Sequence, residues 1–343
     1  MTDKLGDLEG RDADIVASSL LRRDLPVVLA GSASVKLAEE IAWGLGGYVH
    51  PVEIETFADG EIGVEIGASV RRRQVFIVQS LYAPVQEHLM ELLLLIDACR
   101  RASAAEINLV VPYLAYSRQD RKAKPRSAIS AKLVARMLET AGADRLITFD
   151  LHSGQVQGFY EIPCDNLPGA DVLAPVVQRA LLGDDICLVA PDASGLDRVR
   201  AFMRRLDADG DERPDDYPLA VVDKRKARAG GGAEAVIGEV RGMHCVIVDD
   251  MIATAVSLMD AVNALRSAGA SAVSMVVTHG LFNGDALRKV AGAGLQNLWL
   301  TDTVPVSEDI RSLRGVKVVS VAPLLMKVIK RVSLGDSLEE IYG

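Results

Sequence analysis

The sequence predicts an α/β protein of two domains, each built on a mostly parallel sheet flanked by helices. Short apolar runs that suit buried strands alternate with longer runs that suit helices, which is typical of parallel sheets covered on both faces. The alternation runs through the chain twice, with units of similar length. At 343 residues the chain exceeds one ordinary core and suits two domains.

The expected strands are short runs rich in Val, Ile and Leu. They cover residues 26–31, 74–79, 107–114 and 145–151 in the first half, and 186–191, 219–224, 244–250, 274–280 and 297–302 in the second. The expected helices cover residues 35–46, 89–102, 130–142 and 258–269. Ala-Gly pairs follow two of these helices and fit C-terminal caps.

These elements divide the chain into four segments. We expect a polar extension over residues 1–23, an N-terminal domain over 24–168, a C-terminal domain over 169–323, and a C-terminal helix over 324–343 that packs back on the N-terminal domain. The boundary between the domains falls in the Pro- and Gly-containing stretch DNLPGADV.

Composition narrows the possible partners and the compartment. The formal net charge of −9 argues against a nucleic-acid-binding surface, which needs clustered Lys and Arg. The longest apolar run, LMELLLLI, is too short to span a bilayer, so no membrane is expected. The four cysteines are far apart and suit reduced core residues, and the N-terminus is polar and acidic. We therefore expect a cytoplasmic protein.

Polar residues stand at the carboxyl ends of several expected strands, where open α/β sheets bind ligands. Asp249 and Asp250 end one strand, and adjacent carboxylates there suit the vicinal hydroxyls of a sugar. The N–H groups of the loop that follows suit a phosphate. An exposed acidic pair beside a helix N-terminus is the alternative.

Two further strand ends carry residues that suit a metal ion. His152 and Asp192 would supply the one or two protein ligands that Mg²⁺ on a nucleotide needs. A structural role is the more usual one for a lone His or for a lone Asp in a Pro-Asp turn.

A basic, Gly-rich stretch, KRKARAGGGAEA, begins at Lys224. Such a loop would close over a polyphosphate, where its cations would offset charge that develops on a transferred phosphoryl group. A solvated basic loop is the alternative.

Taken together and in order, ten segments resemble the ribose-phosphate pyrophosphokinase family, also called PRPP synthases, over residues 25–343. The segments are FADGEI (57–62), QSLYAPVQEHLMELLLLIDACRRASA (79–104), YSRQDRK (116–122), ISAKLVARML (129–138), FDLHSGQVQGFYEIPCDNL (149–167), PDASG (191–195), DKRKAR (223–228), VDDM (248–251), THGLFNG (278–284) and TDTVP (301–305).

This resemblance implies a reaction and an architecture. Members of the family transfer the pyrophosphoryl group of ATP to the 1-hydroxyl of ribose 5-phosphate, with Mg²⁺, and give PRPP and AMP. Each half resembles a type I phosphoribosyltransferase domain, and the active site lies between the halves. Members assemble from dimers, usually into hexamers, so self-association is expected.

The resemblance also implies a role for individual residues. The expected ATP-binding residues are Phe57, Asp59, Glu61, Arg118, Gln119 and His152, of which the first three reach adenine from a neighbouring subunit. The expected ribose 5-phosphate residues are Asp192, Asp249, Asp250, Thr254, Ala255, Val256 and Ser257. The expected metal ligands are His152 and Asp192, and the expected catalytic residues are Lys224, Arg225 and Lys226.

The phosphate loop departs from the family pattern. Ala253 stands where an aspartate is usual and Val256 where a glycine is usual. Because a β-branched residue is poorly suited to positive φ, we expect a rearranged loop that binds ribose 5-phosphate more weakly by about 1–2 kcal/mol. Lys226 also replaces a usual arginine and cannot form its two-pronged contact.

Three functions are consistent with this pattern. The first is an active PRPP synthase. The second is a weakly active or inactive paralogue that regulates an active partner by co-assembly, which the altered loop favours. The third is a phosphoribosyltransferase that consumes PRPP, which leaves the N-terminal segments FADGEI and SRQD without a role.

Overall fold

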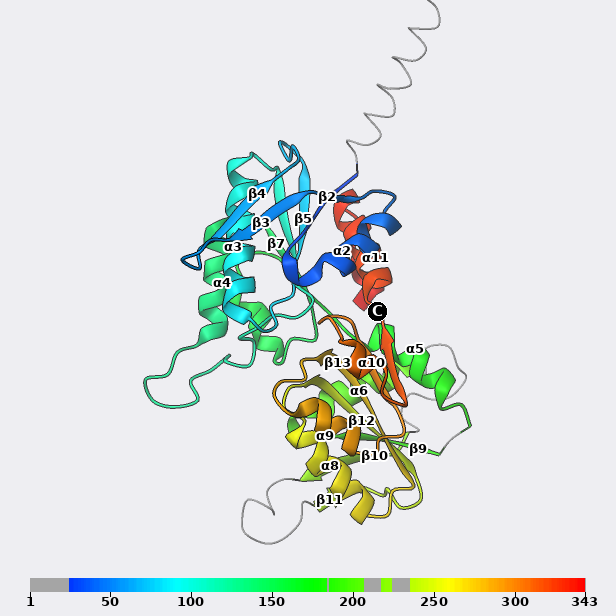
Figure 1. Ribbon diagram of the computed structural model, residues 1–343. Coiled ribbons are helices and arrows are strands. Elements are labelled where there is room, and N and C mark those ends of the chain that lie inside the picture. The colour runs from blue at the N-terminus through cyan, green and yellow to red at the C-terminus, as the bar shows by residue number, and fades with distance from the viewer. Residues whose placement is uncertain (1–24, 184, 207–216, 224–234, 343) are drawn as a thin grey trace, which may run out of the picture.

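The computed structural model describes residues 25–183, 185–206, 217–223 and 235–342. The expected extension over residues 1–23 lies outside this range. The chain forms two α/β bodies joined in series, with the N-terminal body at the top of Figure 1 and the C-terminal body at the bottom. The predicted α/β class with mostly parallel sheets is confirmed.

The N-terminal sheet has the order β2-β1-β5-β6-β7-β8, and its strands are parallel. The strands are β1 (Val27–Ala30), β2 (Val49–His50), β5 (Gln74–Val78), β6 (Glu106–Val110), β7 (Arg145–Phe149) and β8 (Cys164–Leu167). The central strands are almost wholly buried, as expected when both faces of a sheet are covered. A separate antiparallel hairpin comprises β3 (Val52–Thr56) and β4 (Ile62–Ile66).

Helices cover both faces of this sheet. On one face, α3 (Val85–Arg101) and α4 (Ser130–Ala141) bury a Leu-rich stripe, and the 3-10 turn η2 (Gly154–Phe159) joins this core. On the other, the 3-10 turn η1 (Ser32–Ser34) leads into α2 (Val35–Gly44), which packs against α11 (Ala322–Leu334). Figure 1 shows α11 (red) beside α2 (blue), so the end of the chain returns to the first domain.

The C-terminal sheet has the order β11-β10-β9-β12-β13-β14-β15, with β11 antiparallel to β10 and the other pairs parallel. The strands are β9 (Ile186–Ala190), β10 (Leu219–Asp223), β11 (Ala235–Ile237), β12 (His244–Ile252), β13 (Ala272–Gly280), β14 (Leu298–Thr301) and β15 (Val316–Val319). The longest two, β12 and β13, lie side by side in the middle and carry their carboxyl ends toward the N-terminal domain.

The helices of the second domain also form two layers. One face carries α5 (Ala170–Ala180) and α6 (Leu196–Leu206), and the other carries α8 (Val256–Ser267) and α9 (Ala286–Gly292). The remaining elements are short: η3 (Ala193–Gly195), α10 (Glu308–Arg311) and α12 (Glu339–Tyr342). Within the described ranges, no helix has both the length and the apolar composition needed to cross a membrane.

Candidate active site

A cleft of about 1180 Å³ lies at the carboxyl ends of strands from both domains. Arg118, Asp150 and His152 line it from the N-terminal domain, and Asp192 and Arg198 are among the residues that line it from the C-terminal domain. The cleft therefore brings together segments that are far apart in the chain, as the rule for open α/β sheets predicts.

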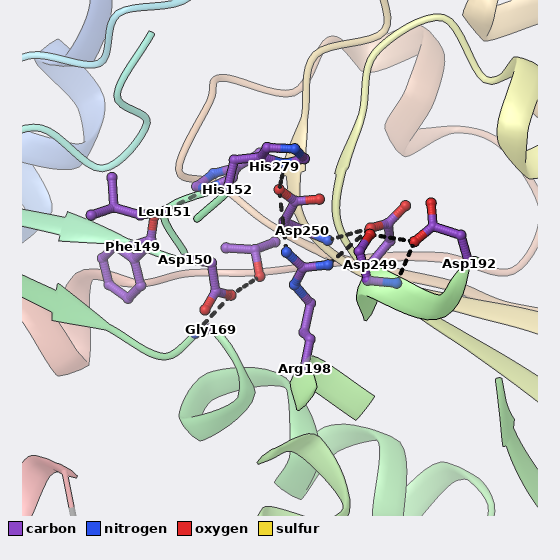
Figure 2. Close-up of polar contacts among 12 residues, drawn as sticks. Phe149, Asp150, Leu151, His152, Gly169, Asp192, Arg198, Asp249, Asp250 and His279 are labelled. Atoms are coloured by element: carbon purple, nitrogen blue, oxygen red, sulfur yellow. Dashed lines mark hydrogen bonds and ion pairs between the residues drawn. The ribbon is translucent and has the colours of Figure 1, made fainter. Parts of the chain in front are cut away.

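The acidic pair Asp249–Asp250 lies on β12, which continues two residues beyond it to Ile252. The Asp250 side chain is only 3% exposed, and its Oδ2 lies 2.7 Å from Nδ1 of His152. Arg198 spans the pair: its Nη1 lies 3.2 Å from Oδ1 of Asp249 and its Nη2 lies 3.4 Å from Oδ2 of Asp250. Figure 2 shows these groups converging at the meeting point of the two domains.

The two adjacent carboxylates have opposite electrostatic environments. Burial, and then the charge of Asp250, raises the pKa of Asp249. Burial also acts on Asp250, but the hydrogen bond from His152 and the charge of Arg198 outweigh it and lower the pKa of Asp250. The charged form of Asp250 is therefore stabilised by its neighbours, whereas the charged form of Asp249 is disfavoured.

His152 follows β7 and is the N-terminal domain's contact with the acidic pair. Its hydrogen bond with Asp250 is the main cause that raises the pKa of the imidazole. Because Nδ1 is engaged by Asp250, Nε2 is the nitrogen left to meet a ligand in the cleft. The side chain is 42% exposed and lines the cleft, so His152 is not a core histidine.

Asp192 precedes η3 and lines the same cleft. Its Oδ1 accepts a hydrogen bond from the N–H of Ser194 at 3.0 Å and another from the Ser194 hydroxyl. No cluster of three or more His, Cys, Asp or Glu side chains suited to a metal occurs in the described part of the chain. The imidazole of His152 and the carboxylate of Asp192 both line the cleft, and a metal on a nucleotide's phosphates needs one or two such protein ligands.

The loop between β12 and α8 lines the cleft with Thr254, Ala255, Val256 and Ser257. The expected conflict between Val256 and a positive φ does not arise, because the positive φ falls on the preceding residue. Ala255 is the left-handed residue, with φ 56°, and Val256 is the first residue of α8. A small side chain therefore occupies the strained position, and the β-branched one has helical geometry that it tolerates.

Other expected ATP residues lie away from the cleft or at its edge. Phe57, Asp59 and Glu61 lie at the turn of the β3–β4 hairpin, where the Phe57 N–H donates to the Glu61 carbonyl at 2.8 Å. None of the three lines the cleft of its own chain. Gln119 accepts a hydrogen bond from the Ser130 hydroxyl at 2.6 Å, whereas Arg118 lines the cleft.

The expected catalytic residues Lys224, Arg225 and Lys226 lie outside the described residues. Sequence reasoning missed two cations that the described part does show. Arg198 stands six residues after Asp192, in the first turn of α6, and its contact with the acidic pair depends on tertiary structure. Lys289 donates to the Thr254 carbonyl at 3.3 Å, a contact that only the tertiary structure reveals. It also pairs with Asp285 at 2.8 Å.

Comparison with known proteins gives a consistent result over nearly the whole chain. Residues 26–142 match the N-terminal domain of ribose phosphate pyrophosphokinase, and residues 222–343 match the phosphoribosyl synthetase-associated domain. A ribose-phosphate pyrophosphokinase from Caldanaerobacter subterraneus subsp. tengcongensis is 44% identical over 317 residues, covering 92% of this chain and 97% of the relative. One from Agrobacterium fabrum is 43% identical over 316 residues, covering 92% and 99%.

A solved structure agrees with these relatives. The crystal structure of phosphoribosylpyrophosphate synthetase from Mycobacterium smegmatis superposes with a TM-score of 0.83 at 35% identity. The superposition covers 90% of this chain and 99% of that one. The similarity thus extends through both domains and the cleft between them.

Proposed function

The chain belongs to the ribose-phosphate pyrophosphokinase family, and on that premise we propose how its cleft carries out the family's reaction. The chain is an enzyme that transfers the pyrophosphoryl group of ATP to the 1-hydroxyl of ribose 5-phosphate, giving PRPP and AMP. The comparisons give no support to the regulatory paralogue or the PRPP-consuming transferase, because the relatives matched over nearly their full length are named pyrophosphokinases.

The observation that carries the assignment of roles is the meeting, in one cleft, of an acidic pair, a loop at a helix N-terminus and a histidine from the other domain. In the ribose 5-phosphate half, Asp249 and Asp250 accept hydrogen bonds from the ribose hydroxyls. The backbone N–H groups of the loop, with the Thr254 and Ser257 hydroxyls, bind the 5-phosphate at the start of α8.

In the ATP half, Arg118 and Gln119 contact the nucleotide from the N-terminal domain. Phe57, Asp59 and Glu61 reach the adenine of a neighbouring subunit, which their position on an exposed hairpin turn, outside their own cleft, supports. The site is then complete only in an assembly, and we propose dimers that associate into a hexamer.

Enzymes of this class generally use metal ions, and we propose Mg²⁺ in this chain. His152, through Nε2, and Asp192 would hold it beside the ATP phosphates. When bound, the ion offsets phosphate charge. The free thiols of all four cysteines fit a reducing compartment, and we propose a cytoplasmic location.

Lys224, with Arg225 and Lys226 beside it, is proposed to meet the charge that develops as the pyrophosphoryl group moves. Lys224→Ala should lower kcat and kcat/KM together by about 100-fold, the usual effect of losing one preorganised electrostatic donor. The measurement is AMP formation from ATP and ribose 5-phosphate in a coupled assay. A change confined to KM would assign Lys224 to ground-state binding, and absence of AMP with the unaltered chain would refute the proposed activity.

A further inference from the structure

Asp150 lies two residues before His152 and lines the cleft, yet no role has so far been assigned to it. We propose that Asp150 is a positioning residue whose hydrogen bonds to Gly169 and Thr278 hold the two domains together and thereby hold His152 against Asp250. These two hydrogen bonds are called the clasp below. The inference rests on the proposed function in one respect, namely that His152 acts in the cleft.

The carboxylate of Asp150 joins three parts of the chain. Its Oδ2 accepts a hydrogen bond from the Gly169 N–H at 3.1 Å, in the connection between the domains. The same oxygen accepts a hydrogen bond from the Thr278 hydroxyl, on β13 of the C-terminal domain. Figure 2 shows the Asp150 side chain directed toward Gly169 and not toward the acidic pair. One oxygen atom therefore ties the end of β7 to the connection and to the second sheet.

Gly169 provides an independent sign that this contact is built into the fold. Its backbone is helical, with φ −62°, so glycine is not needed there for conformational freedom. A Cβ at this position would overlap the Thr278 hydroxyl and lie 2.7 Å from Oδ2 of Asp150. Glycine is needed because the three groups pack too closely to admit a side chain.

The backbone around Asp150 is held on both sides. Asp150 itself has φ 31°, a left-handed conformation that persists in a non-glycine residue when surrounding contacts impose it. The Phe149 carbonyl lies 3.2 Å from Nε2 of the buried His279, again from β13. The Leu151 N–H donates to the Asn166 side chain at 2.9 Å. Three consecutive residues are thus anchored, and the next residue is His152.

These contacts assign a specific chemical role to the carboxylate. It acts as a hydrogen-bond acceptor for two donors, and an uncharged amide oxygen of the same shape can accept both. A role as a metal ligand or as a charge would instead need the carboxylate itself. Asp150→Asn and Asp150→Ala therefore separate the two possibilities, because only the first keeps an acceptor in place.

The test compares the two variants on kcat/KM for ATP in the full-length protein. Asp150→Ala should lower it by about 100-fold, the effect of displacing a reacting group by about 1 Å. Asp150→Asn should stay within about fivefold of the unaltered chain, since the acceptor is kept. An equal loss in both variants would overturn the proposal, because charge and not acceptance would then be what matters.

A double-mutant cycle with His152→Ala tests whether Asp150 acts through the histidine. If it does, Asp150→Ala should add less than about threefold in the His152→Ala background. Effects that multiply in the double variant would overturn the proposal. A merely structural contribution to stability would not produce this non-additivity.

Thr278 supplies a matched pair should Asp150→Ala fail to fold. Thr278→Val removes the hydroxyl donor, while Thr278→Ser keeps it. We expect the valine variant to lower kcat/KM for ATP by about tenfold and to melt at a lower temperature, and the serine variant to do neither. Equal behaviour of the two would count against the clasp. The melting temperatures need no turnover, so this arm separates failure of the clasp from failure of the proposed activity.

Discussion

Two turns of the chain place backbone N–H groups at the carboxyl end of a parallel strand, but only one of them faces the cleft. The first follows β1, over residues 31–34, and the second follows β12, over residues 253–257. In the first, the buried carboxylate of Glu91 accepts hydrogen bonds from the N–H and the hydroxyl of Ser32, both at 2.6 Å. In the second, the N-cap residue Ala255 makes no side-chain capping hydrogen bond.

In the first turn, the side chains of Gln79 and Glu91 accept the hydrogen bonds of the backbone N–H groups. Gln79 donates to Glu91 at 2.8 Å and accepts from the Ala33 N–H at 3.0 Å, and a Cβ at Gly31 would lie 2.7 Å from Glu91. Similar local geometry therefore has opposite uses. The N-terminal domain supplies its own anion and gains stability, whereas we propose that the second turn binds the phosphate of ribose 5-phosphate. Glu91 should thus matter for folding, and Asp249 for turnover.

Asp249→Asn tests the comparison between the two turns and should have the largest effect on turnover. Losing a charged acceptor for the ribose hydroxyls should lower kcat/KM for ribose 5-phosphate by about 100- to 1000-fold. The melting temperature should stay the same or rise, because burial and the neighbouring Asp250 already raise the pKa of Asp249 and disfavour its charge. Steady-state kinetics and thermal unfolding of one preparation measure both. A fall in melting temperature with normal turnover would make Asp249 a structural residue.

Glu91→Ala should show the reverse pattern. Removing the buried carboxylate leaves the donors of Ser32 and Gln79 without an acceptor, which should cost about 3 kcal/mol of unfolding free energy. Glu91→Gln is the matched control and should cost less, because one oxygen acceptor remains. Urea unfolding gives the free energies. Turnover per folded molecule should be unchanged, and a loss of ribose 5-phosphate affinity in Glu91→Gln would mean that the first turn also serves the site.

Much of the fold could be predicted from the sequence because its signals are local. Each expected strand run overlaps an observed strand, since central parallel strands read as unbroken apolar runs. The four edge strands β2, β8, β11 and β15 were missed, because strands of two to four residues carry too few residues for a clear pattern. The β3–β4 hairpin was missed as well, because its side chains are half-buried or exposed.

The site was predictable in part for the same reason. Strand ends gave His152, Asp192 and the acidic pair, since the edge of a parallel sheet gathers them. Two contacts could not be predicted from the sequence. The contact between Arg198 and the acidic pair depends on the angle at which α6 leaves η3. The hydrogen bond between Asp150 and Thr278 joins residues that are 128 apart in sequence. Glu91 could have been found, because it lies within an apolar helix run whose 3.6-residue period puts it on the buried face.

The smallest predicted effect concerns the loop between β12 and α8. Ala255, and not Val256, has the left-handed backbone, and Ala255 is 5% exposed while Val256 is 48% exposed. Ala255→Gly should therefore relieve the strained φ and stabilise the loop by about 0.5–1 kcal/mol after the entropy of glycine is counted. The KM for ribose 5-phosphate should fall by about two- to fivefold, with the KM for ATP unchanged.

Val256→Gly is the matched comparison at the next position. It places glycine at the start of α8 and should lower stability by about 0.5 kcal/mol without improving ribose 5-phosphate binding. Kinetics with ribose 5-phosphate as the varied substrate rank the two variants. If Val256→Gly improves the KM more than Ala255→Gly does, then the loop binds phosphate with positive φ at residue 256. The open turn would in that case rearrange on binding, whereas the turn closed by Glu91 stays fixed.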